Sequence, residues 1–446
     1  MSQIQHVFVL MLENRSYDTI FGLSNFTGTL PGGGATSANG LPAEAIINFG
    51  RAGASYQLGH GSPYALGFDP GHEFSDTGVQ LCGLAIANAD TVRNDTLVLD
   101  ATGYPPLAVD PSTTGFAATY EDHGDTVADV FSAFTPDQLP VLNFLAREFG
   151  VCDNWYASIP GPTWPNRFFA LAGTSSGLDH SPSDAQVLEA VVLNAPIFTF
   201  PNGTLFSKMR PTDWLIVQGD VAQSRAIYGM QNQLSRFVGM DALLSQLGDG
   251  SLTARFVFIE PTYDAKNDFR NGNSMHPAGD VRAGEALLKT LYDAISSSKL
   301  WPSSLFVITF DEHGGFFDHV RPPPAVPPGA VENRKLNTHN FAFDRFGVRV
   351  PTLVISPYVS AGTIDHTLYD HTSILKTADK LLGLNGLLNL TARVRAADDV
   401  SKMLALAAAR TDIPKCPAAL PVGIDRPTSE GSPRAKDPFL PLYAHH

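Results

Sequence analysis

Two pairs of polar residues follow apolar runs that are far apart in the sequence. Glu13 and Asn14 come directly after HVFVLML, and Asp311 and Glu312 come directly after LFVITF. Together they offer three carboxylates and one amide oxygen, which suit a hard divalent cation such as Ca²⁺, Mg²⁺ or Mn²⁺. Each pair alone would be explained by acids that end strands and cap helices. Because both pairs occur in the same context, we favour a metal site.

A threonine in the stretch IPGPTWPNR is the candidate nucleophile. Pro165 suits the first turn of a helix and Gly173 suits its end, so Thr163 is expected at or just before a helix N-terminus. Free N–H groups and the helix dipole favour an anion there. One interpretation is that Thr163 simply caps the helix. The other is catalytic, because coordination to a divalent metal would make its hydroxyl a competent alkoxide.

Histidines beside Gly, Pro or acidic residues supply the remaining groups that phosphoryl transfer needs. Such groups hold the non-bridging oxygens, protonate the leaving alkoxide and activate water, and imidazoles do all three near neutral pH. A single histidine in such a loop is more often structural than catalytic, but five together are harder to dismiss. The five are His72, His123, His276, His313 and His319.

Positioning these residues requires a scaffold in which distant segments meet. Apolar, β-branched or aromatic runs predict strands at His6–Leu12, Trp214–Val217, Arg255–Ile259, Leu305–Phe310 and Pro351–Ile355. Helical patterns lie at Asp137–Phe149, Asp280–Ser298, His371–Leu382 and Asp398–Ala409. This alternation predicts an α/β fold, with a mostly parallel sheet and helices on both faces. Ligands bind beyond the carboxyl ends of such strands, where Glu13 and Asp311 would meet.

The remaining segments suggest one large domain with excursions. We expect a catalytic domain at 1–410, with long loop insertions at about 28–122 and 321–345, and a Pro-rich C-terminal tail at 411–446. The first insertion is rich in Gly, Ala and Ser near its start and has few long periodic signals. It is expected to pass over the active edge of the sheet.

Composition excludes several classes of protein. The 446 residues contain 30 Lys and Arg against 44 Asp and Glu, a net charge of −14, which argues against a nucleic-acid binder. Three widely spaced cysteines make neither a disulfide framework nor a zinc cluster. No apolar run is long enough for a transmembrane segment. No signal peptide is visible, which predicts a cytoplasmic protein, or a secreted or periplasmic one if a leader has been removed.

Four stretches of the sequence resemble the phosphoesterase family. They are ENRSYDTIFG at Glu13–Gly22, the block Phe134–Gly177, HPAGDVRAGEALLKTLYDAI at His276–Ile295, and LFVITFDEHGGFFDHVRPP at Leu305–Pro323. That family contains bacterial and plant non-specific phospholipases C and bacterial acid phosphatases, within the alkaline phosphatase superfamily. Four long stretches in the right order are a far more specific signal than a short glycine motif.

The resemblance implies a fold, a cofactor and a role for each candidate residue. The fold would be an alkaline phosphatase-like three-layer α/β sandwich, and the cofactor one divalent metal ion, with Zn²⁺ an alternative to Ca²⁺, Mg²⁺ or Mn²⁺. The implied metal ligands are Glu13, Asn14, Asp311, Glu312 and Thr163. The implied catalytic residues are Thr163 as nucleophile, Asn166 as a phosphate contact, and His72, His123 and His276. His313 and His319 join Asn166 as implied substrate-binding residues.

The expected function is therefore that of a metal-dependent phosphoesterase. We expect a phospholipase C that hydrolyses phospholipid to diacylglycerol and a phosphorylated head group through a phospho-threonine intermediate, with at most peripheral membrane contact. Phe316 and Phe317 beside the metal pair would either meet an acyl chain or be core residues. The alternatives are an acid phosphatase that acts on phosphomonoesters and a non-catalytic module that binds phosphorylated head groups.

Overall fold

The computed structural model describes most of the chain. It covers residues 3–51, 53–82, 113–329, 333 and 335–423, and the strand assignments at 92–93 and 96–97. Parts of both predicted insertions, and the predicted tail beyond residue 423, lie outside the described residues.

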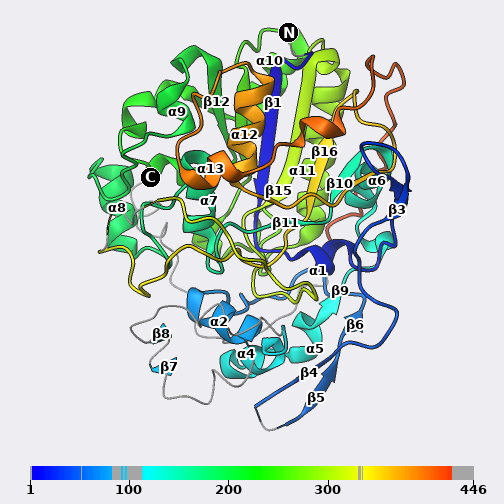
Figure 1. Ribbon diagram of the computed structural model, residues 1–446, viewed down its shortest axis with the longest axis vertical. Coiled ribbons are helices and arrows are strands. Elements are labelled where there is room, and N and C mark those ends of the chain that lie inside the picture. The colour runs from blue at the N-terminus through cyan, green and yellow to red at the C-terminus, as the bar shows by residue number, and fades with distance from the viewer. Residues whose placement is uncertain are drawn as a thin grey trace.

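A ten-stranded sheet forms the centre of the molecule (Figure 1). Its order is β13-β12-β14-β1-β15-β16-β10-β17-β2-β3, and only β16 and β3 run against their neighbours. The sheet is therefore mostly parallel, as expected. Its strands are β13 (Phe237–Gly239), β12 (Trp214–Gln218), β14 (Phe256–Glu260), β1 (His6–Leu12), β15 (Ser304–Phe310), β16 (Thr352–Ile355), β10 (Gly150–Cys152), β17 (Thr363–Asp365), β2 (Thr27–Thr29) and β3 (Ala35–Ser37).

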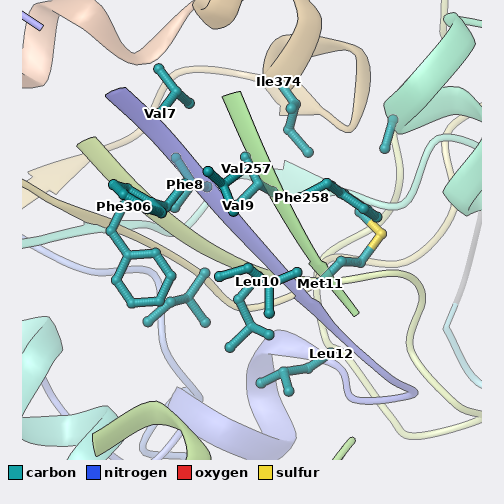
Figure 2. Close-up of a cluster of buried hydrophobic side chains, with 14 of the residues drawn as sticks. Val7, Phe8, Val9, Leu10, Met11, Leu12, Val257, Phe258, Phe306 and Ile374 are labelled. Atoms are coloured by element: carbon teal, nitrogen blue, oxygen red, sulfur yellow. The ribbon is translucent and has the colours of Figure 1, made fainter. Parts of the chain in front are cut away.

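The central strand β1 is covered on both faces. Val7 through Leu12 are all buried, whichever side of the sheet they face, and Figure 2 shows their side chains among those of Val257, Phe258, Phe306 and Ile374. A strand with two buried faces reads as a continuous apolar run rather than as an alternating one. This is why the strands of the sheet centre were predictable from the sequence.

Helices complete the layers around the sheet, and Figure 1 shows α12 in front of the strands. α7 packs against α12, whereas α6 packs against α11, which also contacts α10. The helices are α6 (Pro140–Glu148), α7 (Thr163–Ala172), α10 (Met240–Asp249), α11 (Val281–Ser297) and α12 (Thr372–Leu381). Smaller elements are α1 (Tyr17–Phe21), α8 (Asp184–Val192), α9 (Leu205–Lys208), α13 (Ala392–Ala396), β11 (Trp155–Tyr156) and β18 (Tyr369–Asp370). None of the described helices is long and apolar enough to cross a membrane.

The helix predicted at Asp398–Ala409 is wrong. Only a 3-10 turn forms there, at Val400–Met403, and the chain then continues without a helix. Two backbone donors of this segment are used elsewhere: Val400 N donates to Thr377 Oγ1, and Leu406 N donates to Tyr358 O. These tertiary hydrogen bonds replace the intrahelical ones that a helix would need.

The first insertion is more ordered than expected and lies below the sheet in Figure 1, at the carboxyl ends of β1 and β15. Its elements are β4 (Ile47–Phe49), β5 (Ser55–Gln57), β6 (Gly59–His60), α2 (Phe74–Cys82), β7 (Val92–Arg93), β8 (Thr96–Leu97) and α4 (Phe116–His123), followed by α5 (Val127–Val130) and β9 (Ser132–Ala133). Phe316 and Phe317 are buried in the small apolar core of this insertion, beside Phe116 and Phe131. They are core residues, and the alternative that they meet an acyl chain is wrong.

Candidate active site

The register of β1 and β15 brings the two acidic pairs together. Leu12 pairs with Phe310 in the parallel ladder, so the residues that follow leave the sheet side by side. Asn14 N donates to Asp311 Oδ1 at 3.0 Å, and Arg15 N donates to the backbone oxygen of Glu312 at 3.0 Å. Segments almost three hundred residues apart in sequence thus form one group of acids at the carboxyl edge of the sheet.

The four predicted protein ligands, Glu13, Asn14, Asp311 and Glu312, form what we call the metal-ligand set. All four are buried, and three of their oxygens, Glu13 Oε2, Asn14 Oδ1 and Glu312 Oε1, have no hydrogen-bond partner. A buried acceptor without a donor costs about 1–3 kcal/mol. The chemistry of these three oxygens, two from carboxylates and one from an amide, fits the ligands of a hard divalent cation.

Asp311 is held by an arginine that the sequence reasoning missed. Arg167 Nε donates to Asp311 Oδ2 at 3.0 Å, Nη1 donates to Tyr263 Oη at 2.8 Å, and Nη2 donates to the backbone oxygen of Leu12 at 3.0 Å. Both oxygens of Asp311 are therefore hydrogen-bonded, unlike those of its neighbours. The available signal was spacing, because Arg167 lies four residues after Thr163 and so on the same helix face.

Charge in this group is unbalanced. Burial raises the pKa of Glu13 well above its ordinary value, although the positive charge of Arg167 opposes this shift. Burial likewise raises the pKa of Glu312 to about 7, against the charge of His72. Three buried carboxylates face two positive groups, Arg167 and His72, and a divalent cation would supply further positive charge.

Thr163 is the first residue of α7, and Pro162 is its N-cap. Thr163 therefore does not cap this helix, although it lies at the N-terminus as expected. It is one turn from Arg167 on the same face, and Arg167 is bound to Asp311. Through Arg167, the N-terminal half of α7 is therefore tied to Asp311 of the metal-ligand set.

Asn166 shapes the loop before the helix. Its Oδ1 accepts from Ile159 N at 3.0 Å, and its Nδ2 donates to the carbonyl oxygens of Gly161 at 2.9 Å and Pro162 at 3.0 Å. The side chain is fully buried. In this arrangement the amide holds the loop that presents Thr163, and its predicted contact with phosphate stays a prediction.

His72 and His276 meet at an aspartate that the sequence reasoning also missed. Asp69 Oδ1 lies 3.7 Å from His72 Nδ1, and Asp69 Oδ2 lies 3.5 Å from His276 Nε2. Although burial opposes it, the charges of these histidines lower the pKa of Asp69. His72 Nε2 faces the metal-ligand set, 4.0 Å from Glu312 Oε1 and 3.4 Å from Asn14 Nδ2.

His313 and His123 differ in burial. His313 is buried, with Nδ1 3.2 Å from Glu312 Oε2 and Nε2 2.8 Å from Gln80 Oε1, and burial lowers its pKa to about 3. His123 is on the rim, with 40% of its side chain exposed, and its hydrogen bond to Asp76 raises its pKa to about 9.

His319 belongs to a second acidic cluster, which we call the Arg349 cluster and which comprises Asp18, Asp318, His319 and Arg349. Ligand atoms of Asp18, Asp318 and His319 lie within 4.8 Å of one another. Arg349 fills the space between the acids: Nη2 donates to Asp18 Oδ1 at 3.0 Å and Nε donates to Asp318 Oδ1 at 2.9 Å. His319 Nδ1 lies 2.6 Å from Asp18 Oδ2, and its predicted contact with substrate stays a prediction.

Comparison with known proteins shows the family of the chain. The model of the phosphoesterase family matches residues 4–385. Non-specific phospholipase C3 of Arabidopsis thaliana is 30% identical over 94% of this chain and 76% of its own, and non-specific phospholipase C6 is 31% identical over 94% and 75%. A solved protein of the alkaline phosphatase superfamily from Vibrio parahaemolyticus covers 56% of this chain and 61% of its own, at 15% identity and a TM-score of 0.34.

Proposed function

Because the chain belongs to the phosphoesterase family and is a hydrolase of phosphoric ester bonds, we propose that it is a metal-dependent phospholipase C. Its substrate would be a phospholipid, and its products diacylglycerol and a phosphorylated head group. The similarity to the plant non-specific phospholipases C supports the choice of substrate.

One observation supports the metal dependence: three buried oxygens of the metal-ligand set have no hydrogen-bond partner. Glu13, Asn14, Asp311 and Glu312 would hold the ion, together with Thr163. When bound, a divalent cation would favour ionisation of the threonine hydroxyl and offset the charge on the phosphate oxygens. A role for Thr163 as metal ligand and nucleophile is consistent with its place at the start of α7, whose Arg167 is hydrogen-bonded to Asp311.

The residues of the chain then account for both halves of the reaction. Thr163 would react as the alkoxide, after its hydroxyl proton has left to solvent, and hydrolysis of the intermediate would return it to that alkoxide. Its Oγ1 attacks phosphorus, so the Oγ1–P bond forms while the bond from phosphorus to the diacylglycerol oxygen breaks. His72 gives its Nε2 proton to that leaving oxygen. In the second half His72 takes a proton from water, which attacks phosphorus and releases the phosphorylated head group from Thr163. The N-terminal N–H groups of α7 stabilise the charge on the phosphoryl oxygens.

Substitution of the nucleophile tests this mechanism. Thr163→Ala should lower kcat at least about 10³-fold, the scale of losing a nucleophile, while the melting temperature stays near that of the wild type. Thr204→Ala, which removes the side-chain cap of α9, is the matched control and should cost about 1 kcal/mol of stability without changing kcat. Near-wild-type turnover by Thr163→Ala would exclude the phospho-threonine route.

The substrate is tested separately. Phosphomonoester hydrolysis would use the same atoms, and the burial of Phe316 and Phe317 removes one argument for a lipid. Purified protein should release diacylglycerol from phosphatidylcholine vesicles faster than it hydrolyses p-nitrophenyl phosphate, and a chelator should abolish both. Activity on the monoester alone would make the protein an acid phosphatase, and no turnover of either would favour a head-group-binding module. Since the net charge is −14, we expect slower rates on purely anionic vesicles.

A further inference from the structure

We propose that Tyr263 is a positioning residue of the metal site: its hydroxyl, bound to Glu260, orients the guanidinium of Arg167, which in turn orients Asp311. Because this role concerns the metal ion, it rests on the proposed function. It deepens that function by naming residues that act on a ligand from outside the metal-ligand set. Three hydrogen bonds in series connect these residues, and no change of protonation is involved.

Arg167 connects Tyr263 to the ligand. Its Nε donates to Asp311 Oδ2 at 3.0 Å, and its Nη1 donates to Tyr263 Oη at 2.8 Å. Its Nη2 donates to the backbone oxygens of Met11 at 3.3 Å and Leu12 at 3.0 Å. A guanidinium is planar and rigid, so a group that fixes one of its nitrogens also fixes the direction of the others. The position of the Tyr263 hydroxyl therefore affects the Nε–H that Asp311 receives.

Asp311 is oriented by donors on both of its oxygens. Oδ1 accepts from Asn14 N at 3.0 Å and from Glu312 N at 2.7 Å, and Oδ2 accepts from Arg167. A carboxylate oxygen can accept twice, so Oδ2 keeps one lone pair for an ion. Hydrogen bonds from residues outside the ligand set commonly orient a metal-binding carboxylate in this way. Loss of the Arg167 bond would leave Oδ2 without that constraint.

The hydroxyl of Tyr263 has one direction because its two partners differ in character. A guanidinium can only donate, so the hydroxyl oxygen accepts from Arg167. The hydroxyl hydrogen then points to Glu260 Oε2, which lies 2.7 Å from Tyr263 Oη. Burial raises the pKa of Tyr263 well above its ordinary value, although the charge of Arg167 opposes the shift, so the hydroxyl keeps its hydrogen. Tyr263 therefore accepts from one side and donates to the other.

Glu260 anchors this series of bonds to the sheet. It is the buried last residue of β14, a strand that pairs with both β1 and β12. Its Oε2 also accepts from Gln223 N at 2.8 Å, and its Oε1 accepts from Ser224 N at 3.2 Å and from Ser224 Oγ. Both oxygens thus have donors within the protein. Glu260 is fixed without a cation, so it can serve as a rigid support for Tyr263.

Tyr263→Phe tests the positioning role. The change removes the hydroxyl but keeps the ring beside Arg167, whose Cζ lies 5.3 Å from the ring centre. The guanidinium can then turn toward Glu260, whose Oε2 lies 3.9 Å from Nη1, and away from Asp311. Chelator-treated protein is titrated calorimetrically with Mg²⁺, Mn²⁺, Ca²⁺ and Zn²⁺. For the ion that the wild type binds most tightly, we expect the Kd to rise about 10- to 100-fold.

Tyr292→Phe is the matched control. Tyr292 is also buried, and its hydroxyl donates to the backbone oxygen of Pro414 at 2.7 Å, but it lies on α11 and has no contact with Arg167 among the described hydrogen bonds. This variant should lose a similar hydrogen bond and leave the metal Kd unchanged. An unchanged metal Kd in Tyr263→Phe, or an equal rise in both variants, would overturn the proposal.

A double-mutant cycle tests whether Tyr263 acts through Arg167. Arg167→Met removes the hydrogen bond to Asp311, so adding Tyr263→Phe to it should change the metal Kd less than about twofold. A further rise as large as that of Tyr263→Phe alone would mean that Tyr263 acts by another route, and the assigned role would be wrong. If Arg167→Met does not fold, the comparison of Tyr263→Phe with Tyr292→Phe decides alone.

Turnover separates this role from the proposed function. Wild-type hydrolysis of phosphatidylcholine, with a metal Kd that does not change in Tyr263→Phe, would refute only the positioning role. A Kd that rises as expected, in a protein that hydrolyses no phospholipid, would refute only the phospholipase C activity. If the wild type binds none of the four ions, the positioning role and the metal dependence fail together.

Discussion

The loops after β1 and β15 together form two buried acidic clusters. The clusters differ in how many of their oxygens have a hydrogen-bond partner. The metal-ligand set comes first along both loops. A few residues further on, the same loops supply Asp18 and Asp318 to the Arg349 cluster. In each cluster an arginine donates through Nε to an aspartate: Arg167 to Asp311 at 3.0 Å, and Arg349 to Asp318 at 2.9 Å.

The two clusters differ in whether every oxygen has a hydrogen-bond donor. In the Arg349 cluster every carboxylate oxygen has a donor: Asp18 from Arg349 and His319, and Asp318 from Arg349 and the backbone of Asp18 and Val320. In the metal-ligand set three oxygens have none. Ligand distances single out the Arg349 cluster as a candidate metal site, whereas unmet acceptors single out the metal-ligand set.

The largest loss of stability should follow substitution of Arg349, whose charge offsets those of the acids in the Arg349 cluster. Arg349→Met leaves Asp18 and Asp318 facing each other without their guanidinium, and uncompensated buried charge costs about 3–5 kcal/mol. Urea unfolding measures this loss. Metal affinity, measured calorimetrically on the folded variant, should not change. A weakened metal site would show that the two clusters act as one.

The dependence of stability on pH should differ with and without metal. Since burial raises the pKa of Glu312 to about 7, the folded apoprotein holds a proton that the unfolded chain loses near pH 4.5. Stability of the apoprotein should therefore fall as pH rises from about 4.5 to 7, by about 3 kcal/mol for this group.

A saturating divalent cation should remove that loss, because it binds the ionised carboxylate. Burial also raises the pKa of Asp318, to about 6, so a smaller loss between about pH 4 and 6 should remain with metal present. Urea unfolding from pH 4 to 8, in chelator and in metal, measures both. Identical pH profiles in the two conditions would contradict a cation at Glu312.

Removal of one acid from the metal-ligand set should not destabilise the apoprotein, in contrast to substitution of Arg349. Glu13→Gln should weaken divalent-metal binding about 100-fold, which is about 2.7 kcal/mol, because a carboxylate ligand becomes a neutral amide. The apoprotein should be as stable as the wild type or more stable, since the glutamine is neutral at every pH, whereas buried Glu13 is neutral only when it binds a proton. Titration calorimetry with Mg²⁺, Mn²⁺, Ca²⁺ and Zn²⁺ would also identify the preferred ion. Unchanged affinity for all four would remove Glu13 from the ligands.

The smallest effect is expected at His319. His319→Gln should cost about 1 kcal/mol at pH 6, because its hydrogen bond to Asp18 is charge-assisted when the ring is protonated. Its pKa is raised by Asp18 despite burial, so this stabilisation is complete below the unfolded pKa of about 6.5 and is lost as pH rises through the higher folded value. Urea unfolding at pH 6 and 9 checks the difference. A fall in kcat/KM of more than about tenfold would instead support the predicted substrate contact.

The sequence alone determined the strands and helices whose hydrophobic pattern reflects how their own residues are buried. β1 and β15 are continuous apolar runs because both their faces are buried, and α11 shows its stripe because one face is buried, with Val281, Leu288 and Ile295 inside. Glu13 and Asp311 were predictable as partners because they follow such strands, and the carboxyl ends of parallel strands share one edge.

Tertiary structure decided what depends on partners distant in sequence. Asp69 and Arg349 have no local pattern that marks them, and Arg167 has only its helical spacing from Thr163, because an ion pair between segments far apart leaves no periodicity. The five histidines looked equivalent in sequence, yet neighbours such as Pro70, Ala278 and Asp18 give each ring a different set of contacts. The local sequence pattern determines which residues of a helix or strand are buried and which way the element faces. The charge balance and the hydrogen-bond partners of a buried polar group depend on segments distant in sequence, so they are decided only in the folded structure.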